Sequence, residues 1–306
     1  MLDTIRVKYP ISPDKEELQY WMCKTITTTR GTRVSYIYNP IITEDKVMLK
    51  YTYIPFDYTG KPILTLEFSL PKLLYGNNHQ MIGSIDGTIK LANMYLSMVP
   101  NAPILDLAEG ILIRVDMCYN HQVGEAVDDY IRSLQYLDYP HRKTRYLKNE
   151  GVEFKAKHIF TKFYNKQKES GRVEAFGILR QESTLLEPKD IQKIFKARKP
   201  TLLNVSRDIV MDYLNDDLKK LSLLDNSIGT HDTTLNTLST SLGPYAGPYY
   251  YALLKEKMGK SRKEIARETN THPRSLDRRI RKIVEAHVPL TITETKEPLT
   301  PLHVNL

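Results

Sequence analysis

Three short patterns in this chain of 306 residues each place a basic residue and a reactive residue two positions apart. They are Arg114-Val115-Asp116, Tyr164-Asn165-Lys166 and Arg180-Gln181-Glu182. On a β-strand, residues i and i+2 point to the same face, so each pair would present its two side chains together. If the three strands are neighbours, one face of a sheet would display two carboxylates, one tyrosine and three cations.

Such a face suits the cleavage of a phosphodiester bond by a tyrosine. Carboxylate oxygens are the ligands that Mg²⁺ or Mn²⁺ prefers, and the metal would polarise the phosphate while Tyr164 attacks it. Lys166 would favour the phenolate or neutralise the developing charge. Each pattern alone has a plainer interpretation. Arg-x-Asp and Arg-x-Glu on strands commonly form ion pairs, and one tyrosine among twenty is commonly a packing residue.

The elements that must position these residues follow from the period of the apolar residues. Alternation predicts strands at 32–38, 46–54, 63–70, 111–120, 151–166 (a hairpin or bent strand) and 172–183. Helical spacing predicts helices at 81–98, 123–137, 188–198, 206–224 and 248–287, with a Thr/Ser/Gly/Pro-rich connector at 231–248. The prediction is an α+β fold: an antiparallel-sheet catalytic domain over 1–200, an α-helical region over 201–287, and a loosely ordered tail over 288–306.

The net charge of +8 is concentrated in two segments. Residues 141–172 carry ten Lys and Arg against three Glu, and residues 251–285 carry eleven against five Asp and Glu. Two basic segments on an otherwise acidic chain indicate two contacts with a polyanion, first of all DNA or RNA. Solvated basic surface is the plainer alternative for either segment.

The second basic segment contains a pattern typical of a helix-turn-helix at 260–286. Ala266 allows close helix approach, Asn270 tolerates the left-handed turn, and Pro273 fits a first helical turn. Leu276, Ile280 and Ile283 form the apolar face of the second helix, which would enter the major groove. The predicted DNA contacts here are Arg262, Arg274, Ser275, Arg278 and Arg279. An amphipathic helix pair that serves only for packing is the alternative.

Four segments resemble the gene II/X family of filamentous-phage and plasmid replication initiators. They are LEFSLPKLLYGNN (66–78), LIRVDMCYN (112–120), HIFTKFYNKQKE (158–169) and GILRQES (177–183), in the family's order and at comparable spacing. The resemblance covers roughly residues 1–200. The paired His-apolar-His ligands of better-known nickases are absent from this sequence, so the metal site would be carboxylate-based or recruit a single histidine such as His158.

The resemblance implies an endonuclease that starts rolling-circle replication by nicking one strand at an origin. Tyr164 would become linked to the 5′ phosphate, leaving a 3′ hydroxyl that primes synthesis, and rejoining would close the circle. The implied metal ligands for Mg²⁺ or Mn²⁺ are Asp116 and Glu182, with Glu67 as a third. Lys166 would assist catalysis, and the expected DNA contacts in this part of the chain are Lys72, Arg114 and Arg180.

Several function classes are excluded or left open by the sequence. A tyrosine recombinase would need a His-x-x-Arg pair before the tyrosine, and a P-loop helicase would need Gly-x-x-x-x-Gly-Lys-Ser/Thr; neither occurs. A host helicase and a DNA polymerase are therefore expected partners, beside double-stranded and single-stranded origin DNA, and a homodimer is left open. A helix-turn-helix repressor without catalysis remains the second hypothesis.

The absence of long apolar runs, a signal-peptide pattern or a cysteine framework predicts the cytoplasm of a bacterial host and no membrane.

Overall fold

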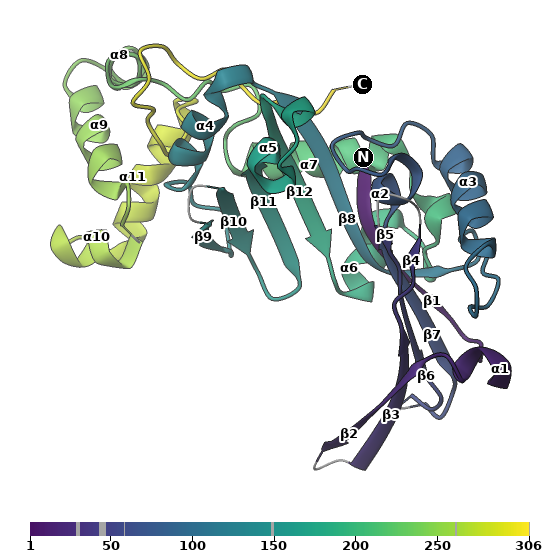
Figure 1. Cartoon of the computed structure of the whole chain (residues 1–306). Coiled ribbons are helices and arrows are strands. Elements are labelled where there is room, and N and C mark those ends of the chain that lie inside the picture. Colours follow the sequence, from purple (N-terminus) through teal and green to yellow (C-terminus); the bar gives the residue numbers. More distant parts are fainter. Residues whose placement is uncertain (29–30, 43–46, 58, 148–149, 261, 306) are drawn as a thin grey trace. The chain divides into compact units, whose positions relative to one another are not determined.

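A computed structural model describes residues 1–306 except 29–30, 43–46, 58, 148–149, 261 and 306. The chain is mixed α/β with a large antiparallel sheet (Figure 1). It divides into two compact units. Unit 1 comprises residues 1–118 and 183–210, and unit 2 comprises residues 119–182 and 211–306. The predicted division into a catalytic domain and a DNA-binding region is a functional one, and it stays a prediction.

Unit 1 is built mainly from strands. They are β1 (Leu2–Tyr9), β2 (Met22–Thr28), β3 (Gly31–Tyr38), β4 (Ile41–Ile42), β5 (Val47–Met48), β6 (Lys50–Ile54), β7 (Ile63–Ser69) and the start of β8 (Ile111–Gln122). The hydrogen-bonded order is β2-β3-β6-β7-β1-β8, with β4 and β5 as a separate pair. The helices are α1 (Lys15–Leu18), α2 (Leu70–Tyr75), α3 (Ile85–Ser97), α6 (Pro188–Phe195) and the start of α7 (Arg207–Lys220).

Strict alternation of buried and half-buried residues explains the central strands of unit 1. In β1, Ile5, Val7 and Tyr9 are buried, and in β7 Leu64 and Leu66 are buried opposite Tyr9 and Val7. A period of two turns every second side chain to the same face, which here is the core. These strands are therefore fixed in register by burial.

Helix α2 follows β7 directly and was not predicted. Ser69 caps it by accepting a hydrogen bond from the Lys72 backbone N–H, Pro71 stands in its first turn, and Gly76 ends it with a φ of 68°. A positive φ of this kind favours glycine. The segment at 66–78, the first of the four that resemble the gene II/X family, is thus the end of a strand, a capped helix and a left-handed glycine in succession.

Unit 2 combines the end of β8 and the first part of β12 with a hairpin and most of the helices. Its strands are β8, β9 (Lys143–Leu147), β10 (Gly151–Lys155), β11 (Ile159–Asn165) and β12 (Ile178–Leu185), in the order β8-β12-β11-β10-β9. Its helices are α4 (Val127–Leu134), α5 (Lys166–Ser170), most of α7, α8 (His231–Leu242), α9 (Ala246–Lys257), α10 (Arg262–Glu268) and α11 (Pro273–Glu285). Two 3₁₀ turns, at 124–126 and 173–175, also belong to unit 2, and a third, at 202–204, belongs to unit 1.

The predicted connector at 231–248 is wrong, because residues 231–242 form helix α8. Thr230 caps it by accepting from the Thr233 backbone N–H. Packing against α9 explains why threonine and serine are tolerated: a Cβ on Gly247 would lie 2.4 Å from the Ser239 Cα, so the two helices approach through small residues. Tertiary packing here overrides weak helix propensity.

The tail was also predicted wrongly, because residues 288–305 pack onto unit 2. Val288, Leu290 and Ile292 are buried. The Thr291 hydroxyl donates to the Ser133 carbonyl at 2.8 Å, and the Tyr130 hydroxyl donates to the Thr300 carbonyl at 2.6 Å. The apolar residues in this segment lack periodicity because it is an extended strap. None of the helices that the structure describes has the length and apolar character that crossing a bilayer requires.

Candidate functional site

One of the three sequence patterns, Arg114-Val115-Asp116, lies in unit 1, and it forms an ion-pair cluster. Arg114 donates from Nη1 to Glu67 Oε1 at 2.9 Å and from Nη2 to Asp116 Oδ2 at 2.7 Å. Arg6 also pairs with Glu67. Arg6 lies on β1, which is hydrogen-bonded to β7 on one side and to β8 on the other. The prediction that Arg114 and Asp116 share a strand face is confirmed. Arg6 was missed, because only the strand order makes it a neighbour of Glu67.

The cluster does not present a free pair of metal ligands. The Asp116 side chain is only 3% exposed, and burial raises the pKa of this carboxyl, although Arg114 and the Thr184 hydroxyl oppose that shift. Both Glu67 and Asp116 are already compensated by arginine. Among the residues that the structure describes, no three His, Cys, Asp or Glu side chains are grouped to hold a metal ion. Glu67 and Asp116 therefore do not fit a preformed magnesium centre.

In unit 2, Tyr164 stands near the end of β11 on its half-exposed face. Across the hairpin its partner is Gly151. A Cβ on Gly151 would lie 2.5 Å from the Phe163 carbonyl oxygen and 2.6 Å from the Tyr164 Cβ. Glycine is thus needed at this position, because any side chain there would displace the tyrosine.

The phenol of Tyr164 is directed to a carboxylate. Its hydroxyl donates to Glu182 Oε2 at 2.9 Å, and the Glu182 side chain is 13% exposed. Arg180 Nε lies 3.9 Å from the same oxygen, and Arg180 Nη1 donates to Asn120 Oδ1 at 3.2 Å. Arg180 is fully buried. This position makes Arg180 a support for the Glu182 carboxylate rather than a surface contact for DNA.

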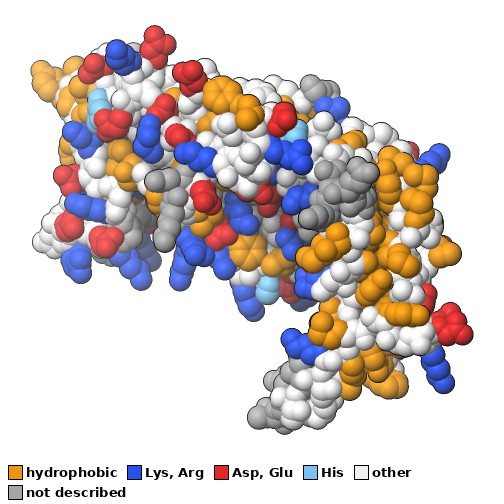
Figure 2. Space-filling view, in the orientation of Figure 1, with side chains coloured by type: hydrophobic (Ala, Val, Ile, Leu, Met, Phe, Trp, Pro, Cys, Tyr) orange, Lys and Arg blue, Asp and Glu red, His pale blue; other side chains and the backbone are white. Residues whose placement is uncertain are grey.

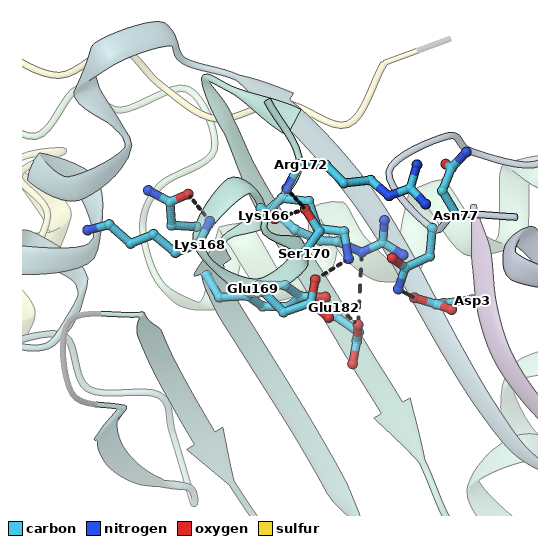
Figure 3. Close-up of polar contacts among 12 residues, drawn as sticks. Asp3, Asn77, Lys166, Lys168, Glu169, Ser170, Arg172 and Glu182 are labelled. Atoms are coloured by element: carbon cyan, nitrogen blue, oxygen red, sulfur yellow. Dashed lines mark hydrogen bonds and ion pairs between the residues drawn. The ribbon is translucent and has the colours of Figure 1, made fainter. Parts of the chain in front are cut away.

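The expectation that Lys166 shares a strand face with Tyr164 is wrong, because β11 ends at Asn165. The Asn165 side chain accepts from the Lys168 backbone N–H at 3.1 Å and starts helix α5 at Lys166. Lys166 nevertheless comes near the tyrosine: its fully buried Nζ lies 5.6 Å from the centroid of the Tyr164 ring. It also pairs with Glu169 at 2.5 Å, as the close-up in Figure 3 shows.

The face of the β9–β11 strands that carries Tyr164 is strongly basic. The cross-strand pairs Glu153↔Lys162, Glu153↔Arg145 and Lys155↔Lys143 place these five side chains on the Tyr164 face. Four of them are cationic and one is acidic. Figure 2 shows Lys and Arg side chains gathered along the lower edge of unit 2, over α10 and the strands β9–β11. The sequence indicated the charge but not this shared face, which depends on the hairpin register.

The predicted turn between the last two helices is confirmed. Asn270 has a φ of 47°, the Thr271 N–H donates to the Ala266 carbonyl at 2.8 Å, and His272 caps α11 by accepting from the Arg274 N–H. Leu276, Ile280 and Ile283 are buried as predicted. A role of this helix pair in DNA binding stays a prediction.

The predicted DNA contacts of this segment differ in exposure. Arg274 and Arg278 are exposed, whereas Ser275 and Arg279 are half-buried. The Arg279 guanidinium lies 5.6 Å from the centroid of the Tyr249 ring on α9, so it also takes part in packing. Arg262 begins α10, and its side chain lies outside the described residues.

Two other predicted residues, Lys72 and His158, are described each within its own unit. Lys72 is exposed on α2 of unit 1. His158 precedes β11, whereas Tyr164 is near the other end of that strand. Six residues of extended chain span roughly 20 Å. His158 is therefore not placed to ligate a metal beside Tyr164.

No protein-family model and no curated protein matches the chain. One solved structure with some similarity is that of a rolling circle replication initiator protein from Geobacillus stearothermophilus. The two are 13% identical, the alignment covers 71% of this chain and 95% of that chain, and the TM-score is 0.33. A TM-score of this size does not define a shared fold.

Proposed function

We propose that this protein initiates rolling-circle replication by nicking one DNA strand with Tyr164. The observation that carries the proposal is the hydrogen bond from the Tyr164 hydroxyl to Glu182, on a strand face that also bears Lys143, Lys155 and Lys162. The carboxylate that accepts a hydrogen bond from the tyrosine hydroxyl can act as the base that removes its proton. The cations on the same face can bind the phosphates of a DNA strand.

In the proposed step, Glu182 accepts the phenolic proton while the Tyr164 oxygen attacks the scissile phosphorus. The bond from phosphorus to the 3′ oxygen breaks, that oxygen takes up a proton from solvent, and protonated Glu182 releases its proton to solvent. The product is a 5′-phosphotyrosine and a free 3′ hydroxyl. The total number of phosphate ester bonds is unchanged, so a 3′ hydroxyl can later reverse the reaction and close the circle.

The neighbouring cations have separate roles in this proposal. Lys166 Nζ, buried beside the tyrosine ring, favours negative charge on the attacking oxygen and on the phosphate. Arg180 holds the Glu182 carboxylate in position. The basic face of β9–β11 binds the strand next to the scissile phosphate, and Phe160 on that face offers a ring on which a base can stack.

A divalent metal, Mg²⁺ or Mn²⁺, is part of the proposal only together with DNA. When bound, it would neutralise charge on the scissile phosphate. Mg²⁺ is commonly held by one or two carboxylates and substrate phosphates. Glu182 is the proposed ligand because its carboxylate contacts the Tyr164 hydroxyl, whereas Asp116 and Glu67 each accept a hydrogen bond from Arg114. Mg²⁺ titrated into the protein without DNA should show no saturable heat, while EDTA should abolish nicking. Nicking at full rate in EDTA would remove the metal from the proposal.

The partners follow from the reaction. Origin DNA is the substrate, as duplex for recognition and as a single strand at the nick, with the helix pair at 260–286 proposed as a duplex contact. The chain has no P-loop, so strand separation and synthesis would come from a host helicase and a DNA polymerase. A repressor would use the same helix pair without chemistry, and relaxation of supercoiled origin DNA separates the two functions.

The decisive experiment compares Tyr164→Phe with the native chain on supercoiled DNA that carries the native origin. We expect the variant to bind the DNA but to leave it supercoiled, because only the hydroxyl is lost. Peptide mapping of the native protein–DNA adduct should place the nucleotide on Tyr164.

Tyr146→Phe is the matched control, since Tyr146 lies on β9 and is 39% exposed. This control should nick normally. Undiminished nicking by Tyr164→Phe, or an adduct on another tyrosine, would refute the mechanism.

A further inference from the structure

The β2–β3 hairpin of unit 1 extends beyond the strands that support it. Its two strands pair from Met22↔Ile37 to Thr28↔Gly31. The next strand, β6, pairs with β3 only at Tyr36, Ile37 and Tyr38. From Ser35 to the tip, the described part of the hairpin is therefore a ribbon of two strands, which projects past β6 and β7 in Figure 1.

Both faces of this ribbon carry exposed side chains. On β2 the side chains of Lys24, Thr25 and Thr27 are exposed, and on β3 those of Thr32 and Arg33 are exposed. A ribbon of two strands with no core is at best marginally stable in water. Its sequence also offers few apolar side chains for burial against another protein. The ribbon is thus built to remain polar on both faces.

The charge of the ribbon indicates which kind of partner it can bind. Residues 22–38 contain Lys24, Arg30 and Arg33 and no Asp or Glu, although Arg30 lies outside the described residues. The register pairs Lys24 with Ser35 and Ile26 with Arg33, so Lys24 and Arg33 share one face. Thr27 and Thr32 pair on the opposite face. A cationic face backed by hydroxyls is complementary to a polyanion that also offers hydrogen-bond acceptors.

We propose that the β2–β3 ribbon binds duplex DNA in the major groove. The major groove admits a ribbon of two β-strands, and the seven residues of β2 span roughly 23 Å, about two-thirds of a helical turn of DNA. The cationic face is directed into the groove, where Lys24 and Arg33 contact the phosphates that border it, and Thr27 and Thr32 lie on the outer face. The proposal rests on the proposed function in one respect, which is that the substrate is DNA.

The test is the double variant Lys24→Gln/Arg33→Gln, with Lys15→Gln/Lys90→Gln as the control. The control residues are exposed on α1 and α3 of the same unit, so the change in net charge is equal. Binding to an origin duplex is measured by fluorescence anisotropy between 50 and 200 mM salt. Two lost phosphate contacts should lower the slope of log K against log salt by about 1.8, while the control keeps the native slope.

A second readout separates this proposal from the nicking mechanism. On a saturating single-stranded oligonucleotide the ribbon variant should nick at the native rate, because Tyr164 and its neighbours are untouched. An unchanged duplex slope would overturn the ribbon proposal even if nicking depends on Tyr164. A changed oligomeric state with native DNA affinity would overturn it as well, since the free edge of β2 would then pair with a second chain. The slope of log K against log salt for duplex binding does not depend on whether Tyr164→Phe loses nicking, so the two proposals are tested separately.

Discussion

Lys143 and Lys155 stand directly opposite each other on neighbouring strands, which is an unfavourable arrangement for the isolated protein. Like charges that face each other across a sheet destabilise it, whereas a phosphate chain over the same face would turn both into attractive contacts. We therefore expect Lys143→Gln/Lys155→Gln to have opposite effects on two measurements. It should weaken the binding of single-stranded DNA and leave the fold equally stable or more stable.

The expected magnitudes follow from the number of charges removed. Each phosphate contact with a single strand contributes about 0.7 to the slope of log K against log salt, so two contacts contribute about 1.4. Between 50 and 200 mM salt, the native protein should lose about seven-fold more affinity than the variant. Removing one like-charge pair should raise the free energy of unfolding by roughly 0.2–1 kcal/mol.

Binding to an oligonucleotide that contains the nick site is measured by fluorescence anisotropy, and stability by urea unfolding. The control is Lys219→Gln/Lys296→Gln, which removes two exposed cations from the same unit away from the Tyr164 face. A control that flattens the slope as much as the test variant would show that net charge alone matters. A variant with native binding and lowered stability would refute the assignment of this face.

Further predictions concern stability and the placement of the tyrosine. Burial lowers the pKa of His121 from 6.5 to about 4, so the folded state keeps this side chain neutral while the unfolded state gains a proton as the pH falls. Stability from this group is present above pH 6.5 and is lost toward pH 4, by about 2 kcal/mol at pH 5; urea unfolding should show that loss in the native chain and not in His121→Asn. Asp217 is fully buried and accepts from Tyr139 at 2.5 Å and from Thr161 at 2.8 Å, so Asp217→Ala should cost about 3 kcal/mol in the same assay, and a cost below 1 kcal/mol would contradict this role. Gly151→Ala should slow nicking by about 100-fold with duplex binding intact, because the methyl group displaces Tyr164; a native rate would show that this approach is not critical.

The sequence alone predicted the features that depend on short-range order. Alternation located most strands, including the hairpin at 151–166, and helical spacing located α3, α4, α6 and α7. Asn270 marked the left-handed turn before α11, because few residues other than glycine tolerate it. Each of these signals lies within one turn of helix or a few residues of strand, so no distant contact is needed to interpret it.

The exact neighbours of the predicted residues depended on the tertiary structure. Arg6 lies between Glu67 and Arg114 only because β1 lies between β7 and β8, and this decides that the two carboxylates form ion pairs rather than a preformed metal site. Lys166 lies outside strand β11, because Asn165 caps helix α5, which begins at Lys166. The sequence pointed to Tyr164 but could not show that its hydroxyl reaches Glu182.

Burial explains the two segments that were predicted wrongly. Helix α8 is rich in threonine and serine, and it forms because its small residues allow close contact with α9 at Gly247. The strap over 288–305 has no period because it is held by single contacts to unit 2, such as that of Thr291 with Ser133. Local propensity is worth only tenths of a kcal/mol per residue, whereas each buried apolar side chain contributes about 2 kcal/mol, so long-range packing decides where the two disagree.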